Sequence, residues 1–177
     1  MPLNELKQKI LALDNELDQS YQVIEQLLSR KAKREKHVYC LFTYSMILNH
    51  MQGSQHLVMG NFLVKNASQE ALAHPTILLT IESETDFNFT SKYLAKPDQQ
   101  ASIKADWERV LLDDFDPNTH YCFKYIQQDN LPPDEQITFS NFQLIIPQDA
   151  SIKVAGFTYF NQSNDAIPSL NTIDISV

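Results

Sequence analysis

Hydrophobic residues follow two different spacings along this chain, one before and one after residue 36. Residues 3–36 contain no Pro or Gly, and their large aliphatic residues mostly recur three or four positions apart. In a heptad alignment, seven of the first eight a and d positions are aliphatic, and Ser20 is the exception. A 3.5-residue repeat held over four heptads is typical of a coiled coil. We therefore predict a long N-terminal coiled-coil helix over residues 1–36. Its predicted oligomerisation contacts are Leu3, Leu6, Ile10, Leu13, Leu17, Ile24 and Leu27.

The residues beside the a and d positions, which would form the seam between helices, indicate how many helices associate. Tyr21, Val23 and Leu28 widen the apolar face beyond what two helices would cover. We therefore expect the chain to associate with itself, and a homotrimer is favoured. A second interpretation stays open, in which a single amphipathic helix folds back over the domain that follows it.

Beyond residue 36 the chain changes to short runs rich in aromatic and β-branched residues, separated by Pro, Asn and Asp. Such runs, with no long helix between them, predict an antiparallel β-sandwich over residues 37–177, either immunoglobulin-like or jelly-roll-like. One connection, residues 104–112, is expected to form one or two helical turns. The predicted fold class is therefore mainly β, an antiparallel β-sandwich preceded by a long N-terminal coiled-coil helix. The predicted strands are 37–48, 57–66, 76–82, 87–93, 120–127, 136–146, 152–160 and 170–177.

Two stretches resemble phrases found in bacterial immunoglobulin-like modules. In residues 60–68 a strand ends in Asn66 and a turn of small residues, and a second apolar strand follows at residues 76–79. In residues 131–139 Leu, Pro and acidic residues precede an alternating strand, with Asp134 where these modules have Gly. The resemblance implies a sandwich used for spacing, adhesion or assembly, and it implies no catalytic residue.

Composition and charge narrow the class of protein. The chain has 177 residues, 43% hydrophobic and 20% charged, which suits one folded domain with an appendage. The net charge of the chain is −8, with +1 in residues 1–36 and −9 in residues 37–177. So acidic a domain disfavours nucleic acid as a partner. No apolar run approaches the roughly 20 residues of a membrane span, and the first residues lack the pattern of a secretory signal peptide. We expect cytoplasmic synthesis and no membrane contact, with release as part of a virion, spore or surface structure left open.

His and Cys residues are the first candidates for a metal site. His37 and Cys40 fall in the first predicted strand, and His120 and Cys122 fall in the fifth. Residues three apart on a strand point to opposite faces, whereas residues two apart share a face, so the four side chains do not converge on a tetrahedral zinc site. A Cys40–Cys122 disulfide and two buried free thiols both remain open, and a reducing cytosol favours the thiols.

Residues 113–118 form an acidic run that begins like a calcium-binding loop. Asp114, Asp116 and Asn118 supply the alternating oxygen ligands with which such a loop starts. However, Thr119 replaces the required Gly, and Tyr125 stands where the bidentate Glu belongs. We therefore interpret the run as a solvated acidic turn, and the sequence predicts no metal site.

Motifs for catalysis are also missing. His50, His56 and His74 fall in or beside turns, with no Ser or Cys nucleophile in a recognisable elbow. The three Gly residues of the chain form no phosphate-binding loop. We expect no catalytic residue, no cofactor and no enzymatic activity.

Trp107 is the one candidate for ligand contact, because it lies in a connection among charged residues. It could stack on a sugar or anchor a partner, and the other interpretation is a Trp that plugs one end of the sandwich. The favoured function is a non-enzymatic structural or interaction protein of the virion, surface-appendage or adaptor type, which oligomerises through its helix and displays β-sandwich heads. Its expected partners are further copies of itself, another protein or a glycan. The alternative is a carbohydrate- or peptide-binding module that uses the loops around Trp107.

Overall fold

The chain divides into two units, Met1–Lys36 and His37–Val177. The computed structural model describes residues 21–22, 38–51, 53–94, 105–161 and 163–176. Of the first unit only Tyr21 and Gln22 are described, and their backbone is helical. The seven predicted seam residues, Leu3 to Leu27, lie outside the described residues. The second unit, called the β-domain below, carries all of the structure that follows.

The fold class predicted from the sequence is wrong and is corrected to all-β with sandwich-like sheets. No described residue of His37–Val177 is helical, and strand Trp107–Val110 replaces the helical turns expected at residues 104–112. A heptad pattern states which residues would share a face if a segment were helical, but it cannot supply the partner that buries that face. The coiled coil, the trimer and the virion context that depend on it have no support in the described structure.

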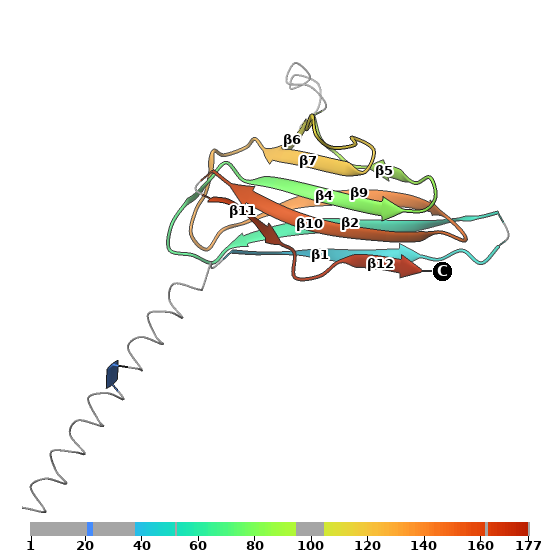
Figure 1. The fold of residues 1–177 in the computed structure, drawn as a ribbon, viewed down its shortest axis with the longest axis horizontal. Coiled ribbons are helices and arrows are strands. Elements are labelled where there is room, and N and C mark those ends of the chain that lie inside the picture. Colours follow the sequence, from blue (N-terminus) through green and yellow to red (C-terminus); the bar gives the residue numbers. More distant parts are fainter. Residues whose placement is uncertain (1–20, 23–37, 52, 95–104, 162, 177) are drawn as a thin grey trace, which may run out of the picture. The chain divides into compact units, whose positions relative to one another are not determined.

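Two antiparallel sheets face each other in the β-domain (Figure 1). The first sheet has the order β1-β2-β9-β5, and its strands are β1 (Val38–Ile47), β2 (Gln55–Asn66), β9 (Gln136–Pro147) and β5 (Asn88–Thr90). The second has the order β11-β10-β4-β7-β6, with β12 also on β10, and its strands are β4 (Thr76–Ser83), β6 (Trp107–Val110), β7 (His120–Tyr125), β10 (Ser151–Phe160), β11 (Ser163–Pro168) and β12 (Ile173–Ser176). A short pair, β3 (Leu72–Ala73) and β8 (Asn130–Leu131), completes the described strands.

The strands form where the side chains alternate, because successive residues of a strand point to opposite faces of its sheet. In β2 every second residue from His56 to Asn66 is buried, and β10 repeats the pattern from Ile152 to Phe160. All eight predicted strands overlap an observed strand, which confirms them. The sequence did not predict β3, β6, β8 or β11.

Aromatic rings from both sheets fill the core. Phe139 on β9 stacks on Phe123 on β7, with ring centroids 4.4 Å apart, so the contact joins the two sheets. Phe42 and Phe62, on the neighbouring strands β1 and β2, pack at 4.7 Å. Gly156 on β10 faces these two rings, and the absence of a side chain there leaves room for them. The sheets are therefore held together by large rings that pack over a small residue.

Asn66 joins the two stretches that resemble immunoglobulin-like modules. Its side chain is fully buried, and its Nδ2 donates to the carbonyl oxygens of Glu70 at 2.8 Å, Leu131 at 2.9 Å and Pro132 at 3.0 Å. Its Oδ1 accepts hydrogen bonds from the backbone N–H and the hydroxyl of Ser68. The end of β2 and the turn before β9 are thus fastened to each other by one side chain.

Asp134 has a backbone φ of 59°, in the left-handed region that Gly adopts without strain. We expect Asp134→Gly to stabilise the protein by about 0.5–1 kcal/mol, because a residue with a Cβ is strained in this conformation. Chemical denaturation would measure the change. Asp149→Gly, at a turn residue whose φ is not positive, is the matched control and should be neutral or destabilising. A loss of stability in Asp134→Gly would contradict the prediction.

Candidate functional site

Among the described strands, β1 is an edge strand, because it pairs with β2 on one side and with no strand on the other. At the start of its other side, the Cys40 carbonyl accepts a hydrogen bond from Leu170 N–H, and the Phe42 backbone exchanges two with the Asn171 side chain. The backbone N–H and C=O groups of every second residue in a strand point to the same side. Those of Tyr44 and Met46 therefore point away from β2, as those of Phe42 do. In the described part of the chain, no segment pairs with this stretch, residues 43–47, which we call the β1 edge.

Large apolar side chains are exposed along the β1 edge and the hairpin that joins β1 to β2. Met51 at the hairpin turn is 79% exposed, Ile47 is 50% exposed and Met46 is 44% exposed. Several exposed apolar side chains gathered in one hairpin favour an interaction site over ordinary surface. We call the whole set the hairpin patch, and its members are Tyr44, Met46, Ile47, Leu48, Met51 and Met59.

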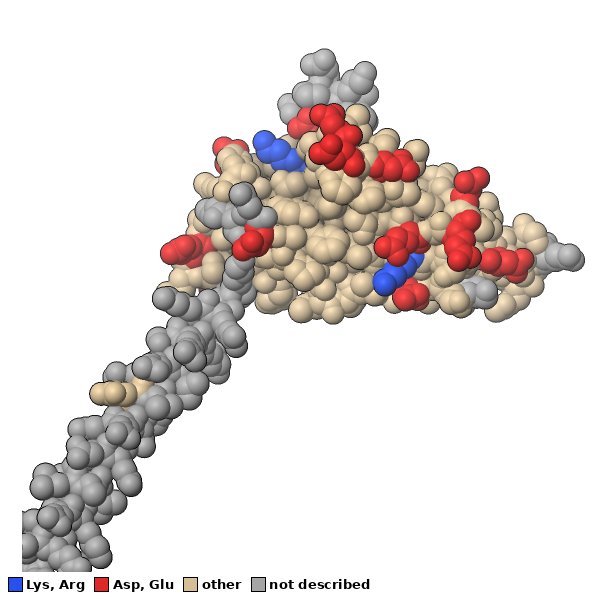
Figure 2. Space-filling model, viewed as in Figure 1, with Lys and Arg blue, Asp and Glu red and all other residues tan. Residues whose placement is uncertain are grey.

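The hairpin patch lies within 27 consecutive residues, 38–64, that include no Asp, Glu, Lys or Arg. The remainder of the β-domain is acidic, and on the face shown in Figure 2 acidic side chains outnumber basic ones. Proteins usually protect an edge strand with charged side chains or Pro, which discourage pairing with other chains. The β1 edge has neither. The alternating pattern predicts β1 as a strand, and the charge gap is the signal in the sequence that marks it as a candidate binding surface.

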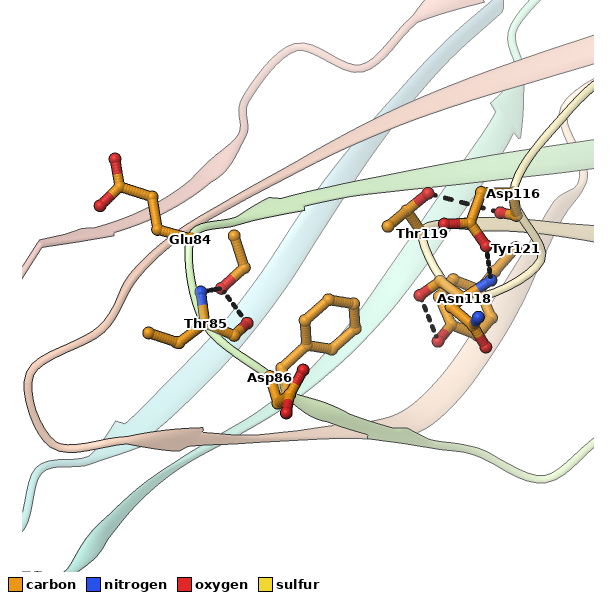
Figure 3. Close-up of a pocket in the computed structure, with 9 residues that line it drawn as sticks. Glu84, Thr85, Asp86, Asp116, Asn118, Thr119 and Tyr121 are labelled. Atoms are coloured by element: carbon orange, nitrogen blue, oxygen red, sulfur yellow. Dashed lines mark hydrogen bonds between the residues drawn. The ribbon is translucent and has the colours of Figure 1, made fainter.

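A second surface feature is an open cleft of about 510 Å³ between the loop at residues 83–87 and the loop that precedes β7. Figure 3 shows Asp86 on one side of it and Asp116 with Asn118 on the other. Asp116 is engaged within its own loop, since its Oδ1 accepts the N–H of Asn118 at 2.9 Å. Tyr121, in the cleft wall, is 8% exposed, and its hydroxyl donates to the Asn118 carbonyl at 2.9 Å.

The cleft is lined by acidic and hydrogen-bonding side chains. Burial, as the largest cause, raises the pKa of Tyr121, and the nearby Arg109 guanidinium, 4.7 Å from the ring centroid, partly opposes this rise. A Tyr ring with so little exposed face gives a sugar almost nothing to stack on. The cleft accepts hydrogen bonds and repels anions, and its geometry points to no specific ligand.

Trp107 lies in the core and does not face a ligand. It is 2% exposed, its Nε1–H donates to the Thr138 carbonyl at 3.1 Å, and its ring packs against Tyr125 and Phe139. The structure therefore agrees with a Trp that plugs the sandwich. The carbohydrate- or peptide-binding alternative loses the residue on which it depended.

The candidate metal and catalytic residues are dispersed or engaged elsewhere. Cys40 and Cys122 are buried free thiols on different sheets, and burial raises the pKa of Cys40 to about 12 and of Cys122 to about 11. His37 lies outside the described residues, and His120 Nδ1 is 3.0 Å from the Thr119 hydroxyl. Within the described ranges, no three or more His, Cys, Asp or Glu side chains are placed to hold a metal ion.

His56 has a structural role at the base of the hairpin. Its Nδ1 accepts the N–H of Asn49 at 3.0 Å, so Nε2 carries the proton and donates to the Gln148 carbonyl at 3.0 Å. The side chain is fully buried and both ring nitrogens are engaged. His56 therefore anchors the hairpin that carries the exposed apolar residues. Among the described residues, no helix has the length and apolar character needed to span a membrane.

Comparison with known proteins finds no matching family model and no matching curated protein. Among solved structures, the chain is similar to a cohesin module from a family 33 glycoside hydrolase of Clostridium perfringens, at 8% identity and a TM-score of 0.42, covering 78% of this chain and 96% of that one. It is also similar to a carbohydrate-binding module of cellobiohydrolase 9A from Clostridium thermocellum, at 13% identity and a TM-score of 0.40, covering 75% and 96%. A third is the C-terminal domain of the antigen I/II-family protein AspA of Streptococcus pyogenes, at 9% identity and a TM-score of 0.37, covering 79% and 46%. Likenesses this distant assign neither a family nor a function to this chain.

Proposed function

We propose that the β-domain is a non-enzymatic protein-interaction module that binds its partner along the β1 edge and the hairpin patch. The observation that carries this proposal is an edge strand whose outer backbone groups pair with no described segment, with exposed apolar side chains and no charge, on an otherwise acidic domain. An unprotected edge of this kind favours association with an added strand, and natural proteins avoid it where they have no use for it.

Addition of a partner strand to β1 would use both the backbone groups of the β1 edge and its exposed side chains. The free N–H and C=O groups of Tyr44 and Met46 would give hydrogen bonds to the backbone of any extended segment, which supplies affinity without regard to sequence. Exposed side chains on the two faces of the strand, such as Met46 on one and Ile47 on the other, would supply selectivity for apolar residues at alternate positions. The expected partner segment is therefore extended, apolar at every second residue and without charge.

Met46→Lys tests this function, because a Lys on the edge strand opposes pairing through its charge and its hydration. Peptides should be selected from a displayed random library on the full-length parent protein, and their dissociation constants measured by fluorescence anisotropy. We expect the selected peptides to alternate apolar residues, and we expect Met46→Lys to bind them about tenfold more weakly, which corresponds to about 1.4 kcal/mol.

Leu111→Lys is the matched control, since it places the same charge at an exposed apolar residue outside the hairpin patch. It should bind the selected peptides as the parent does. The melting temperatures of both variants should stay close to that of the parent, because both side chains are exposed. Equal binding by the parent and Met46→Lys would refute the proposed function, as would a library that yields no binder.

A further inference from the structure

We propose that the partner strand is the β1 edge of a second copy of this chain, paired antiparallel in a register centred on Ser45. This inference rests on the proposed function, because it names the occupant of the same edge. Pairing of this kind joins the first sheets of two copies into one continuous sheet around a two-fold axis.

The absence of charge on β1 favours pairing with a second copy. In a two-fold interface each residue lies near residues of its own strand, so a charged group close to the axis would meet a like charge and weaken the pair. The 27-residue stretch without Asp, Glu, Lys or Arg covers all of β1 and nearly all of β2. Pairing with a second copy therefore brings together two strands that carry no charge, although the β-domain as a whole is acidic.

The groups already paired on β1 fix the register in which a second copy can add. Leu170 and Asn171 already occupy the edge at Cys40 and Phe42, so pairing begins beyond Phe42. With Ser45 on the axis, Tyr44 lies opposite Met46 of the second copy, and each of these two residues exchanges both backbone hydrogen bonds with its counterpart. All the free edge groups of Tyr44 and Met46 in both copies are then paired.

This register also brings complementary side chains together across the seam. Tyr44 and Met46 share the face of β1 on which Phe42 lies, and both are exposed in the single chain. Opposite each other across the seam, a Tyr ring and a Met sulfur make a favourable contact. A seam of five residues per copy buries less than the roughly 1,200–2,000 Å² of a standard interface, so we expect a weak, concentration-dependent dimer.

Disulfide trapping of the full-length protein tests the register. Directly opposed residues that do not share backbone hydrogen bonds have Cα atoms about 4.5 Å apart, within the range that a disulfide bridges. Ser45→Cys should therefore form an intermolecular disulfide under mild oxidation, read on a non-reducing gel. Thr43→Cys is the matched control on the same edge. Its two copies would be four residue positions apart along the seam, about 13 Å, which is too far to bridge.

We expect Ser45→Cys to give about tenfold more covalent dimer than Thr43→Cys, because only the former meets the geometric requirement. The native thiols should not contribute, since Cys40 and Cys122 are buried and burial raises both pKa values. Adding Met46→Lys to Ser45→Cys should abolish the excess, and sedimentation of the parent should show a dimer that dissociates on dilution.

Equal trapping of the two Cys variants, or trapping that Met46→Lys leaves unchanged, would overturn the pairing with a second copy. These results are distinguishable from failure of the proposed function. If selected peptides still bind the parent and not Met46→Lys, the β1 edge binds a different protein, and only the inference of a second copy is refuted.

Discussion

An Asn66→Asp variant should be strongly destabilised at neutral pH. The Asn66 amide group donates to the carbonyl oxygens of Glu70, Leu131 and Pro132 in a fully buried position. An ionised carboxylate has nearly the same shape but donates nothing, so it would lose these three hydrogen bonds and place a negative charge against the carbonyl oxygens in a buried position. Breaking a buried hydrogen bond costs about 1–3 kcal/mol and an unpaired buried charge costs more, so we expect a total loss of about 4 kcal/mol or more from a typical 5–15 kcal/mol.

Urea denaturation followed by circular dichroism would measure this loss at neutral and at acidic pH. The variant should lose less stability relative to the parent at acidic pH, where the new carboxyl group is protonated and can donate one hydrogen bond. Asn61→Asp is the matched control on β2. Its oxygen accepts the Asn141 N–H, which a carboxylate accepts equally well, and its position is only half-buried. Its Nδ2 donates to the Thr43 hydroxyl, which can instead donate to a carboxylate. Similar losses for the two variants would show that the Asn66 hydrogen bonds are not what holds the two turns together.

Gly156→Ala should destabilise the protein by about 1–3 kcal/mol, the usual cost of overpacking a core. A Cβ at position 156 would lie 2.3 Å from Cε2 of Phe62 and 2.8 Å from Cζ of Phe42. Both rings belong to the opposite sheet and are buried, so the sheets must move apart or the rings must leave their preferred rotamers. Gly156→Val should cost more than Gly156→Ala.

A double variant separates this clash from a general effect on β10. Phe62→Leu removes the closest ring atoms and should be destabilising by itself, because it leaves a cavity. Combined with Gly156→Ala, it should destabilise by less than the sum of the two single changes, since the new methyl group fills part of that cavity. Additive losses measured by denaturation would contradict the packing of Phe62 on Gly156.

Most strands of the β-domain could be predicted, because burial of one face of a sheet imposes a two-residue period on the sequence. That period is plain in β2 and β10, whose buried residues alternate throughout. β6 and β11 escaped prediction for a physical reason. β6 is four residues long and includes Glu108 and Arg109, and the first half of β11 is polar. Neither segment shows an alternating apolar pattern, and both are placed by backbone pairing to β7 and β10.

β9 shows where the two-residue period misleads. Phe139 and Phe142 are three residues apart, and alternation would place them on opposite faces, yet both are fully buried. A register shift in the pairing of β2 with β9 falls between them, and Asn141 there has a φ of 58°. A bulge of this kind returns the side chains to the core face, and it depends on the partner strand, which the local pattern does not contain.

The sequence by itself determined the alternating strands, the buried character of their apolar faces and the 27-residue stretch without charge. Only the tertiary structure decided that Trp107 is enclosed and that β1 lies at the edge of its sheet. An uncharged strand is equally suited to the centre of a sheet, where both edges are paired and nothing is available to a partner. Strand order depends on contacts between residues far apart in the chain, so the surface that we assign to binding could not be read from the local pattern that forms the strand.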